Sequence, residues 1–252
     1  MRISRRLAAI LAVAAAGAII TTGLALANVA PNGNVSGGVF NFKPSQVPKT
    51  KFHKGALTVG TSTQFAHPSN EPGGNTARVQ LWIDDDIPLA TKSVPTCNPA
   101  GFTSNTTMAQ AMAQCGNAKV GAGTAHTGNN AGSIPGCTLV FNGTNKQLVL
   151  YARIFASTPA DCSNPSTNNG GDTSVTLFGK LKGASGDYGT QLDVDTSATA
   201  LPLGDFTATI KRGNYASARC HDSNHTWDLK VKHTYKDGVT STDHLKKKCK
   251  VG

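Results

Sequence analysis

The segment CTLVFNGTNKQLVLYARIF, residues 137–155, predicts a pair of adjacent strands at the centre of the fold. Asn142-Gly143 is the strongest short hairpin signal in the chain, and apolar runs flank it at 137–141 and 147–155. The second run has few polar residues on either face, so we expect a strand that is buried on both sides. The sequence therefore predicts a sheet built around this hairpin.

Further segments with strand character surround this hairpin along the chain. Short strands punctuated by Gly, Asn and Pro are typical of a β-sandwich or barrel. We therefore predict a mainly β fold, an antiparallel β-sandwich of immunoglobulin-like or jelly-roll-like type over residues 56–252. Two packed β units that divide near 161–172 are the alternative. The further strand candidates are 56–65, 78–86, 174–181, 191–194, 205–211, 218–220 and 227–235.

One short helix is predicted over residues 106–115. Thr106 is a candidate N-cap, and Gly116 can end the helix. Met108, Met112 and Cys115 would share one face, since they are four and three residues apart.

The ends of the domain have a different composition. Residues 1–27 combine a basic start, a long apolar stretch and an Ala25-Leu26-Ala27 triplet, which is the layout of a secretory signal peptide. An uncleaved membrane anchor is the alternative, because 21 apolar residues can span a bilayer. Residues 28–55 are rich in Gly, Asn, Pro and Lys, and we expect them to form a flexible N-terminal arm.

All six cysteines follow the predicted leader, and an even number in an exported chain favours disulfides over metal ligation. Six cysteines allow 15 pairings, and the sequence alone cannot select one of them. We prefer the sequential pairing, in which each disulfide encloses one local unit. The preferred pairs are Cys97–Cys115, Cys137–Cys162 and Cys220–Cys249.

The positive charge is concentrated near the C-terminus. The chain has 24 Lys and Arg against 14 Asp and Glu, and only 15% of its residues are charged, which argues against a coiled coil or a helical bundle. From residue 210 onward there are ten basic and four acidic residues. This basic region could attract an acidic wall polymer or polysaccharide, and a solubilising outer face is the alternative interpretation. The candidate residues are Lys230, Lys232, Lys236, Lys246, Lys247 and Lys248.

Two small groups of residues could bind a metal ion. Asp84 and Asp86 end a predicted strand and offer oxygen ligands of the kind that Ca²⁺ prefers. His221 and His225 have a spacing that can suit zinc. A solvated strand end and a polar hairpin tip are the structural alternatives, and we expect no cofactor.

Several stretches between residues 80 and 250 resemble a loose group of exported actinobacterial proteins. This resemblance implies a disulfide-stapled, β-rich secreted domain and brings no activity, ligand or catalytic residue. The stretches are LWIDDD (81–86), MAQAM (108–112), CGNAKVG (115–121), LPL (201–203) and the set Cys220, Trp227, Tyr235 and Cys249.

No nucleophile elbow, phosphate-binding loop or dinucleotide fingerprint is present in the sequence. We therefore expect a non-enzymatic binding or cell-surface module, secreted or surface-associated, with a basic C-terminal face. With only two Trp and four Tyr, we expect no specific recognition of nucleic acid. The alternative is a secreted hydrolase of carbohydrate or ester substrates that uses Asp84–Asp86 with a histidine such as His67.

Overall fold

The computed structural model describes residues 28–68, 71–128, 134–155, 162, 172–199, 202–221 and 223–252. The predicted leader lies outside the described residues, as does most of the predicted dividing loop at 161–172. No helix within the described ranges is long and apolar enough to cross a membrane.

One antiparallel sheet of twelve strands dominates the structure. Its spatial order is β1-β2-β5-β12-β7-β8-β9-β10-β11-β6-β14-β15. In chain order, these strands are β1 (Asn28–Val29), β2 (Val35–Lys43), β5 (Ala56–Gln64), β6 (Thr76–Asp84), β7 (Lys119–Thr127), β8 (Ile134–Asn142), β9 (Gln147–Ile154), β10 (Thr173–Gly183), β11 (Tyr188–Asp195), β12 (Leu203–Ile210), β14 (Thr226–Tyr235) and β15 (Thr240–Lys248).

Short elements complete the described structure. Two small ladders pair β3 with β16 and β4 with β13, and one α-helix lies between β6 and β7 in the chain. The bounds are β3 (Gln46–Val47), β4 (His53–Lys54), β13 (Ser217–Ala218), β16 (Lys250–Val251) and α1 (Met108–Cys115), with 3₁₀ turns at Pro72–Gly74, Thr91–Ser93 and Gly116–Ala118.

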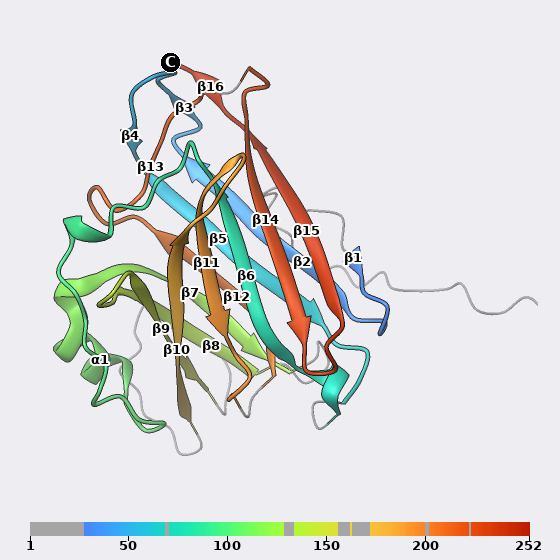
Figure 1. Cartoon of the computed structure of the whole chain (residues 1–252). Helices are drawn as coiled ribbons and strands as arrows, with labels where there is room; N and C mark the ends of the chain where they lie inside the picture. The colour runs from blue at the N-terminus through green and yellow to red at the C-terminus, as the bar shows by residue number, and fades with distance from the viewer. Residues whose placement is uncertain are drawn as a thin grey trace, which may run out of the picture.

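The large sheet curls until it nearly closes into a barrel (Figure 1). In this view β10, β11, β6, β14 and β15 pass in front of β2, β5, β12, β7 and β8. The mainly β, antiparallel fold with one short helix is confirmed. All twelve strands belong to one continuous ladder.

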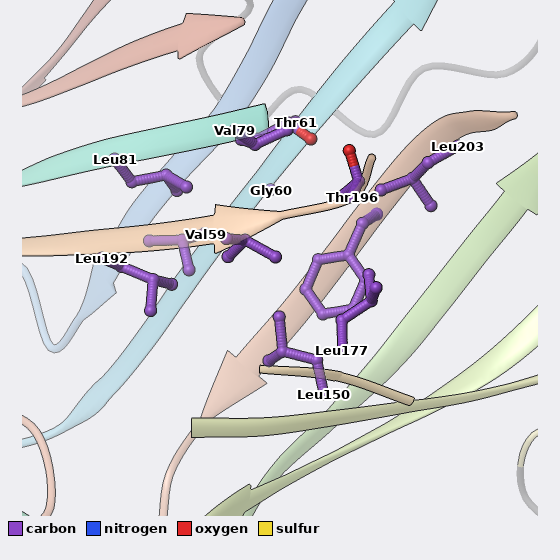
Figure 2. Close-up of a pocket in the computed structure, with 12 residues that line it drawn as sticks. Val59, Gly60, Thr61, Val79, Leu81, Leu150, Leu177, Leu192, Thr196 and Leu203 are labelled. Atoms are coloured by element: carbon purple, nitrogen blue, oxygen red, sulfur yellow. The ribbon is translucent and has the colours of Figure 1, made fainter. Parts of the chain in front are cut away.

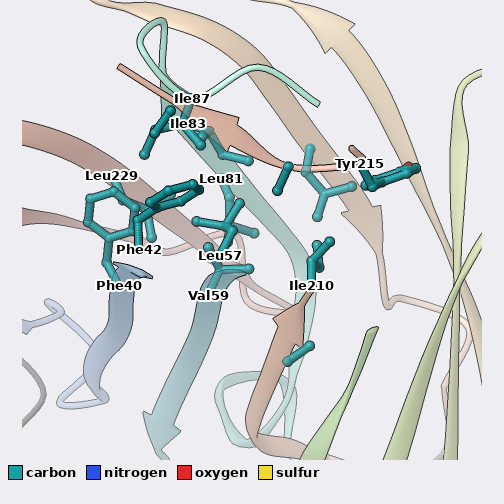
Figure 3. Close-up of a cluster of buried hydrophobic side chains, with 14 of the residues drawn as sticks. Phe40, Phe42, Leu57, Val59, Leu81, Ile83, Ile87, Ile210, Tyr215 and Leu229 are labelled. Atoms are coloured by element: carbon teal, nitrogen blue, oxygen red, sulfur yellow. The ribbon is translucent and has the colours of Figure 1, made fainter. Parts of the chain in front are cut away.

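The main hydrophobic core fills the space between these two sets of strands. Alternate side chains of β2, β5, β6 and β14 point inward because side chains on a strand alternate between its two faces. Phe42 and Trp227 meet edge to face, with ring centroids 5.4 Å apart. Figure 3 shows part of this core, in which Leu57, Ile83 and Leu229 are fully or almost fully buried.

A second, smaller core covers the outer side of β8 and β9. Helix α1 buries Met108, Ala111 and Cys115 against this cluster, which also contains Phe141 and Tyr151. The prediction that 147–155 forms a strand buried on both sides is therefore confirmed. Met112 was predicted to share one face with Met108 and Cys115, which are buried, but it is one of the exposed hydrophobic residues.

The local turn chemistry differs from the prediction at two points. The N-cap of α1 is Thr107 rather than Thr106, and it forms a capping box with Gln110. At the central hairpin, residues 143–146 form the loop, and Asn145 and Lys146 have positive φ angles. Asn142 is buried instead, where its side-chain amide donates to backbone oxygens of the loop before α1.

The N-terminal segment departs most from the prediction. Residues 28–55, which we expected as a flexible arm, contain β1 to β4, and β2 pairs along its whole length with β5. Phe40 and Phe42 of β2 are buried in the main core. The aromatic residues on alternate positions account for this placement, since they bury apolar area that the neighbouring glycines do not offer.

Three disulfides join parts of the chain that lie close together. They link Cys97 to Cys115, Cys137 to Cys162 and Cys220 to Cys249, which is the sequential pairing. The first holds α1 to the loop before it, and the third holds the end of β15 to the segment before β14. Three disulfides indicate an oxidising, extracytoplasmic environment.

Candidate functional site

The outward side of β10, β11, β6, β14 and β15 is the candidate functional surface, which we call the outer face. Helix α1 and its loop cover the outward side of β8 and β9, but the outer face carries polar and charged side chains. Its outward residues follow from strand alternation and register: Lys180 and Lys182 on β10, Gln191, Asp193 and Asp195 on β11, Arg78, Gln80 and Trp82 on β6, Asp228, Lys230 and Lys232 on β14, and Thr242, His244, Lys246 and Lys248 on β15.

The structure brings together four of the six predicted lysines, which we call the lysine row. Lys230, Lys232, Lys246 and Lys248 alternate in phase on β14 and β15 and share the outer face. In the ladder, Lys230 lies opposite His244, Lys232 opposite Thr242, Lys246 opposite Asp228 and Lys248 opposite Thr226. No two lysines of the row are directly opposite each other, which limits their mutual repulsion.

The other two predicted lysines do not join the row. Lys247 lies opposite Trp227, on the inward phase of β15. Lys236 follows the end of β14, where its ammonium lies 3.4 Å from the backbone oxygen of Thr199. Lys247 is excluded by the register between β15 and β14, and Lys236 by its position beyond the end of β14.

Within the lysine row, the ammonium group of Lys230 lies over two aromatic rings. The Nζ atom of Lys230 lies 4.1 Å from the ring centroid of Trp82 and 5.0 Å from that of Tyr188. The Tyr188 hydroxyl lies 3.4 Å from Nδ1 of His244. Burial, together with the charge of Asp228, raises the pKa of Tyr188 to about 12, so its hydroxyl stays protonated. We call these three residues, Trp82, Tyr188 and Lys230, the aromatic–lysine site.

A groove lies on the outer face beside the N-terminal end of β6, and it contains an ion cluster. Asp193 accepts two hydrogen bonds of 2.6 Å from the Arg78 guanidinium and one of 2.7 Å from Lys182. Hydrogen bonding by Arg78 lowers the pKa of Asp193 to about 2. Because the carboxylates of Asp193 and Asp195 offset two of the three positive charges in this groove, this part of the face is less positive than the lysine row.

The predicted calcium ligands are engaged in hydrogen bonds at the C-terminal end of β6. The two Asp84 carboxylate oxygens accept from the backbone N–H groups of Asp86 and Asp228, at 2.9 and 2.7 Å. Those of Asp86 accept from Arg219 Nε at 2.6 Å and from the backbone N–H of His221 at 2.8 Å. Carboxylate atoms of Asp84, Asp85 and Asp86 lie within 4.8 Å of one another, and their contacts tie three segments together.

Among the described residues, the group of carboxylates at Asp84–Asp86 that could hold a metal ion contains neither of the two predicted histidines. His221 contributes its backbone N–H to Asp86. His225 lies beside the Cys220–Cys249 disulfide, with Nδ1 3.5 Å from the Cys220 sulfur. A disulfide sulfur is not the thiolate that zinc requires, so this second cluster does not supply a zinc ligand set.

The residues named for a hydrolase lie far apart. His67 follows the C-terminal end of β5, where it contacts Asn32 and Glu71 and lies beside Gly73, just before β6 begins. Asp84–Asp86 lie at the opposite, C-terminal end of β6, a strand that spans nine residues and hence about 30 Å. The structure therefore does not bring His67 and these aspartates into one site.

An apolar cavity lies between the inner faces of the sheet (Figure 2). Val59, Leu81, Leu150 and Leu192 are among its lining residues, and Thr61 and Thr196 add hydroxyl groups. No titratable side chain of the described residues lines it. Its described lining therefore offers no titratable acid or base for chemistry.

The sequence did not point to the aromatic–lysine site. Trp82, Tyr188 and Lys230 come from three strands that are far apart in the sequence and adjacent in the sheet. The available signal was the alternation in β6, which places Gln80 and Trp82 on the side opposite the buried Leu81. Comparisons of the chain with protein-family models, curated proteins and solved structures give no match.

Proposed function

We propose that the chain is a secreted, non-enzymatic binding module whose lysine row holds an anionic polymer outside the cytoplasm. The observation that carries this proposal is the in-phase placement of Lys230, Lys232, Lys246 and Lys248 on two paired strands. The three disulfides support an extracytoplasmic location.

The spacing of the lysine row supports attraction of a polymer rather than of a single ion. Residues on the same side of one strand recur about every 7 Å, and diagonal neighbours on paired strands lie about 7 to 8 Å apart. These spacings do not exceed the screening length of about 8 Å at physiological ionic strength, so the potentials of neighbouring ammonium groups add. A chain of negative charges can contact several of them at once, whereas a monovalent anion contacts one or two.

The rigidity of the support also favours binding. Both strands belong to the twelve-stranded sheet, and β14 pairs with β6 on its other side. The lysines are thus held at fixed intervals, which reduces the backbone entropy lost on binding.

The two lysines outside the row provide a matched control. We expect K232S/K246S/K248S to weaken binding to polyglutamate by about tenfold at low ionic strength, about 1.4 kcal/mol, and to reduce the salt dependence of binding. The control variant K92S/K236S/K247S removes the same charge from positions off the row and should bind almost as the wild type does. Equal losses in both variants would show that net charge alone acts, and would refute a specific face.

A further inference from the structure

We infer that the polymer is an acidic polysaccharide with carboxylated sugar rings, recognised at the aromatic–lysine site. This inference rests on the function proposed above, and it names the ligand class of that same face. It starts from the position of the Lys230 ammonium over the rings of Trp82 and Tyr188.

The aromatic–lysine site combines two kinds of contact. The Trp82 and Tyr188 rings present apolar surface, and the positive charge of Lys230 lies over both rings. All three residues are only partly buried, so the group faces solvent. A uronate-type sugar ring has one apolar C–H side and a carboxylate at its edge, which matches both contacts in one residue of the polymer.

Amide side chains border the indole ring of Trp82. Gln191 lies directly opposite Trp82 in the β6–β11 ladder, and Gln80 lies two residues earlier on the same side of β6. An amide group offers both a donor and an acceptor, as a sugar hydroxyl does. These two side chains can therefore bond the hydroxyl groups of a ring stacked near Trp82.

The lysine row extends this site along the strands. Lys230 belongs to both groups, and Lys232 and Lys246 lie on either side of it within the face. Further carboxylates of the same polymer can pair with them. The aromatic–lysine site thus selects the sugar, and the row adds charge attraction.

Other polyanions fit the face less well. Nucleic acid binding without base pairing uses several aromatic side chains on which successive bases stack, but the described outer face has one aromatic pair and, at the groove, Phe178. A lipid surface calls for protruding apolar residues. Phe178 is the one large exposed hydrophobic residue of the described outer face. A polyphosphate or an acidic peptide has no sugar ring to stack.

Tryptophan fluorescence gives a direct test in the unmodified protein. The chain has two tryptophans, and Trp227 is fully buried in the core. A change in emission, or protection from iodide quenching, therefore reports on Trp82. We expect polygalacturonate to cause both effects. Polyglutamate of equal charge should cause neither, because it lacks a ring.

Variants extend the test to affinity. We expect the wild type to bind polygalacturonate about ten times more tightly than polyglutamate, and W82A to abolish this preference without weakening polyglutamate binding. F52A removes another exposed aromatic ring, which belongs to none of the strands of the outer face, and should keep the preference. K232S/K246S/K248S should weaken both polymers.

The outcomes separate the two proposals. Binding of both polymers with equal affinity, or no response of Trp82 to polygalacturonate, would overturn the polysaccharide inference and leave the anionic-polymer function standing. Binding of neither polymer would overturn both. If W82A fails to fold, the fluorescence measurement on the wild type still decides.

Discussion

Ser36 Oγ donates a hydrogen bond of 2.7 Å to Asp243 Oδ2, and this bond joins β2 to β15 near the two edges of the sheet. A second contact runs from the Asn28 side-chain amide to the backbone oxygen of Thr242, at 2.8 Å. Among the described strands, β15 has a backbone ladder with β14 but none with β2. The nearly closed sheet is therefore joined at this seam by side chains.

The seam predicts a stability cost for Ser36→Ala. Asp243 is buried, and its Oδ1 has no hydrogen-bond partner among the described residues, so the loss of Ser36 Oγ removes a major contact of this carboxylate. We expect the free energy of unfolding to fall by about 1 to 3 kcal/mol, measured by urea denaturation. Ser197→Ala removes a similar Ser–Asp bond at an exposed site and should change it by less than about 0.5 kcal/mol. Equal changes in the two variants would contradict a structural role for the seam.

His233 predicts a loss of stability at mildly acidic pH. Its ring is 1% exposed, stacks parallel to Tyr235, and has no hydrogen-bond partner among the described residues. Ser241 lies directly opposite it on β15, with Asp243 two residues further, while β6 places Val79 opposite it. Burial lowers its pKa from 6.5 to about 4. The unfolded chain therefore takes up this proton first, and stability falls as pH decreases from about 6.5 to about 4.

The variant His233→Phe tests this dependence. It removes the titrating group and two unpaired nitrogens, so the stability of the variant should decline less than that of the wild type over this pH range. The difference should approach about 3 kcal/mol at pH 4, measured by urea denaturation at a series of pH values. His53→Gln, at an exposed position, should follow the wild-type curve. Parallel curves for His233→Phe and the wild type would disprove the prediction.

Asp193 predicts a loss of stability at lower pH than His233 does. Here the cause is the loss of ion pairs, whereas for His233 it is the burial of a neutral ring. Arg78 and Lys182 lower the pKa of Asp193 from 3.8 to about 2, so the stabilisation is complete above about 3.8 and is lost as pH falls toward 2. Asp193→Asn should lose it at neutral pH too. Since the side chains of Arg78 and Lys182 are about half exposed, screening limits the expected loss to about 1 kcal/mol.

Urea denaturation at pH 7 and pH 2 checks the Asp193 prediction. The difference between Asp193→Asn and the wild type should shrink at pH 2, and it should also shrink in high salt. Asp187→Asn, at an exposed position, serves as the control. A difference that is independent of pH would indicate lost packing instead of lost ion pairing.

Local pattern was sufficient for much of the fold. Alternation located β5, β6, β10 and β14, because each has one face in the core and one facing out. It missed β2, where Gly37 and Gly38 break the pattern. A Cβ atom at Gly38 would lie 2.9 Å from the Gly60 backbone oxygen and 3.2 Å from Leu245 Cδ1. The glycine is therefore required by close contacts with residues that are distant in the sequence.

The candidate site was predictable only in part, for a related reason. Alternation within β14 places Lys230 and Lys232 together, and this needs no knowledge of other strands. The phase of β15 excludes Lys247, and it depends on the register that sets Lys247 opposite Trp227. The contact of Lys230 with Trp82 and Tyr188 depends on a sheet order in which β11, β6 and β14 are neighbours. Such nonlocal order leaves no trace in local spacing.

The last prediction concerns Asp86, which the sequence suggested as a calcium ligand. Its carboxylate is 1% exposed and pairs with the Arg219 guanidinium and the His221 backbone N–H. Arg219 in turn accepts a 2.7 Å hydrogen bond from Trp227 Nε1 at its backbone oxygen. Asp86→Ala should therefore lower the free energy of unfolding by about 3 kcal/mol, because it leaves a guanidinium and an N–H group without their acceptor.

A metal role for Asp86 predicts different behaviour. If the carboxylates hold the chain together through Arg219 and backbone N–H groups, added Ca²⁺ or a chelator should leave the Tm of the wild type unchanged, while Asp86→Ala lowers it. Asp85→Ala, whose side chain is exposed, is the matched control and should melt as the wild type does. A Tm that rises with Ca²⁺ in the wild type but not in Asp86→Ala would show that the cluster binds the ion. Asp86 Oδ1 lies 2.6 Å from Arg219 Nε. This ion pair would have to open before that oxygen could bind Ca²⁺.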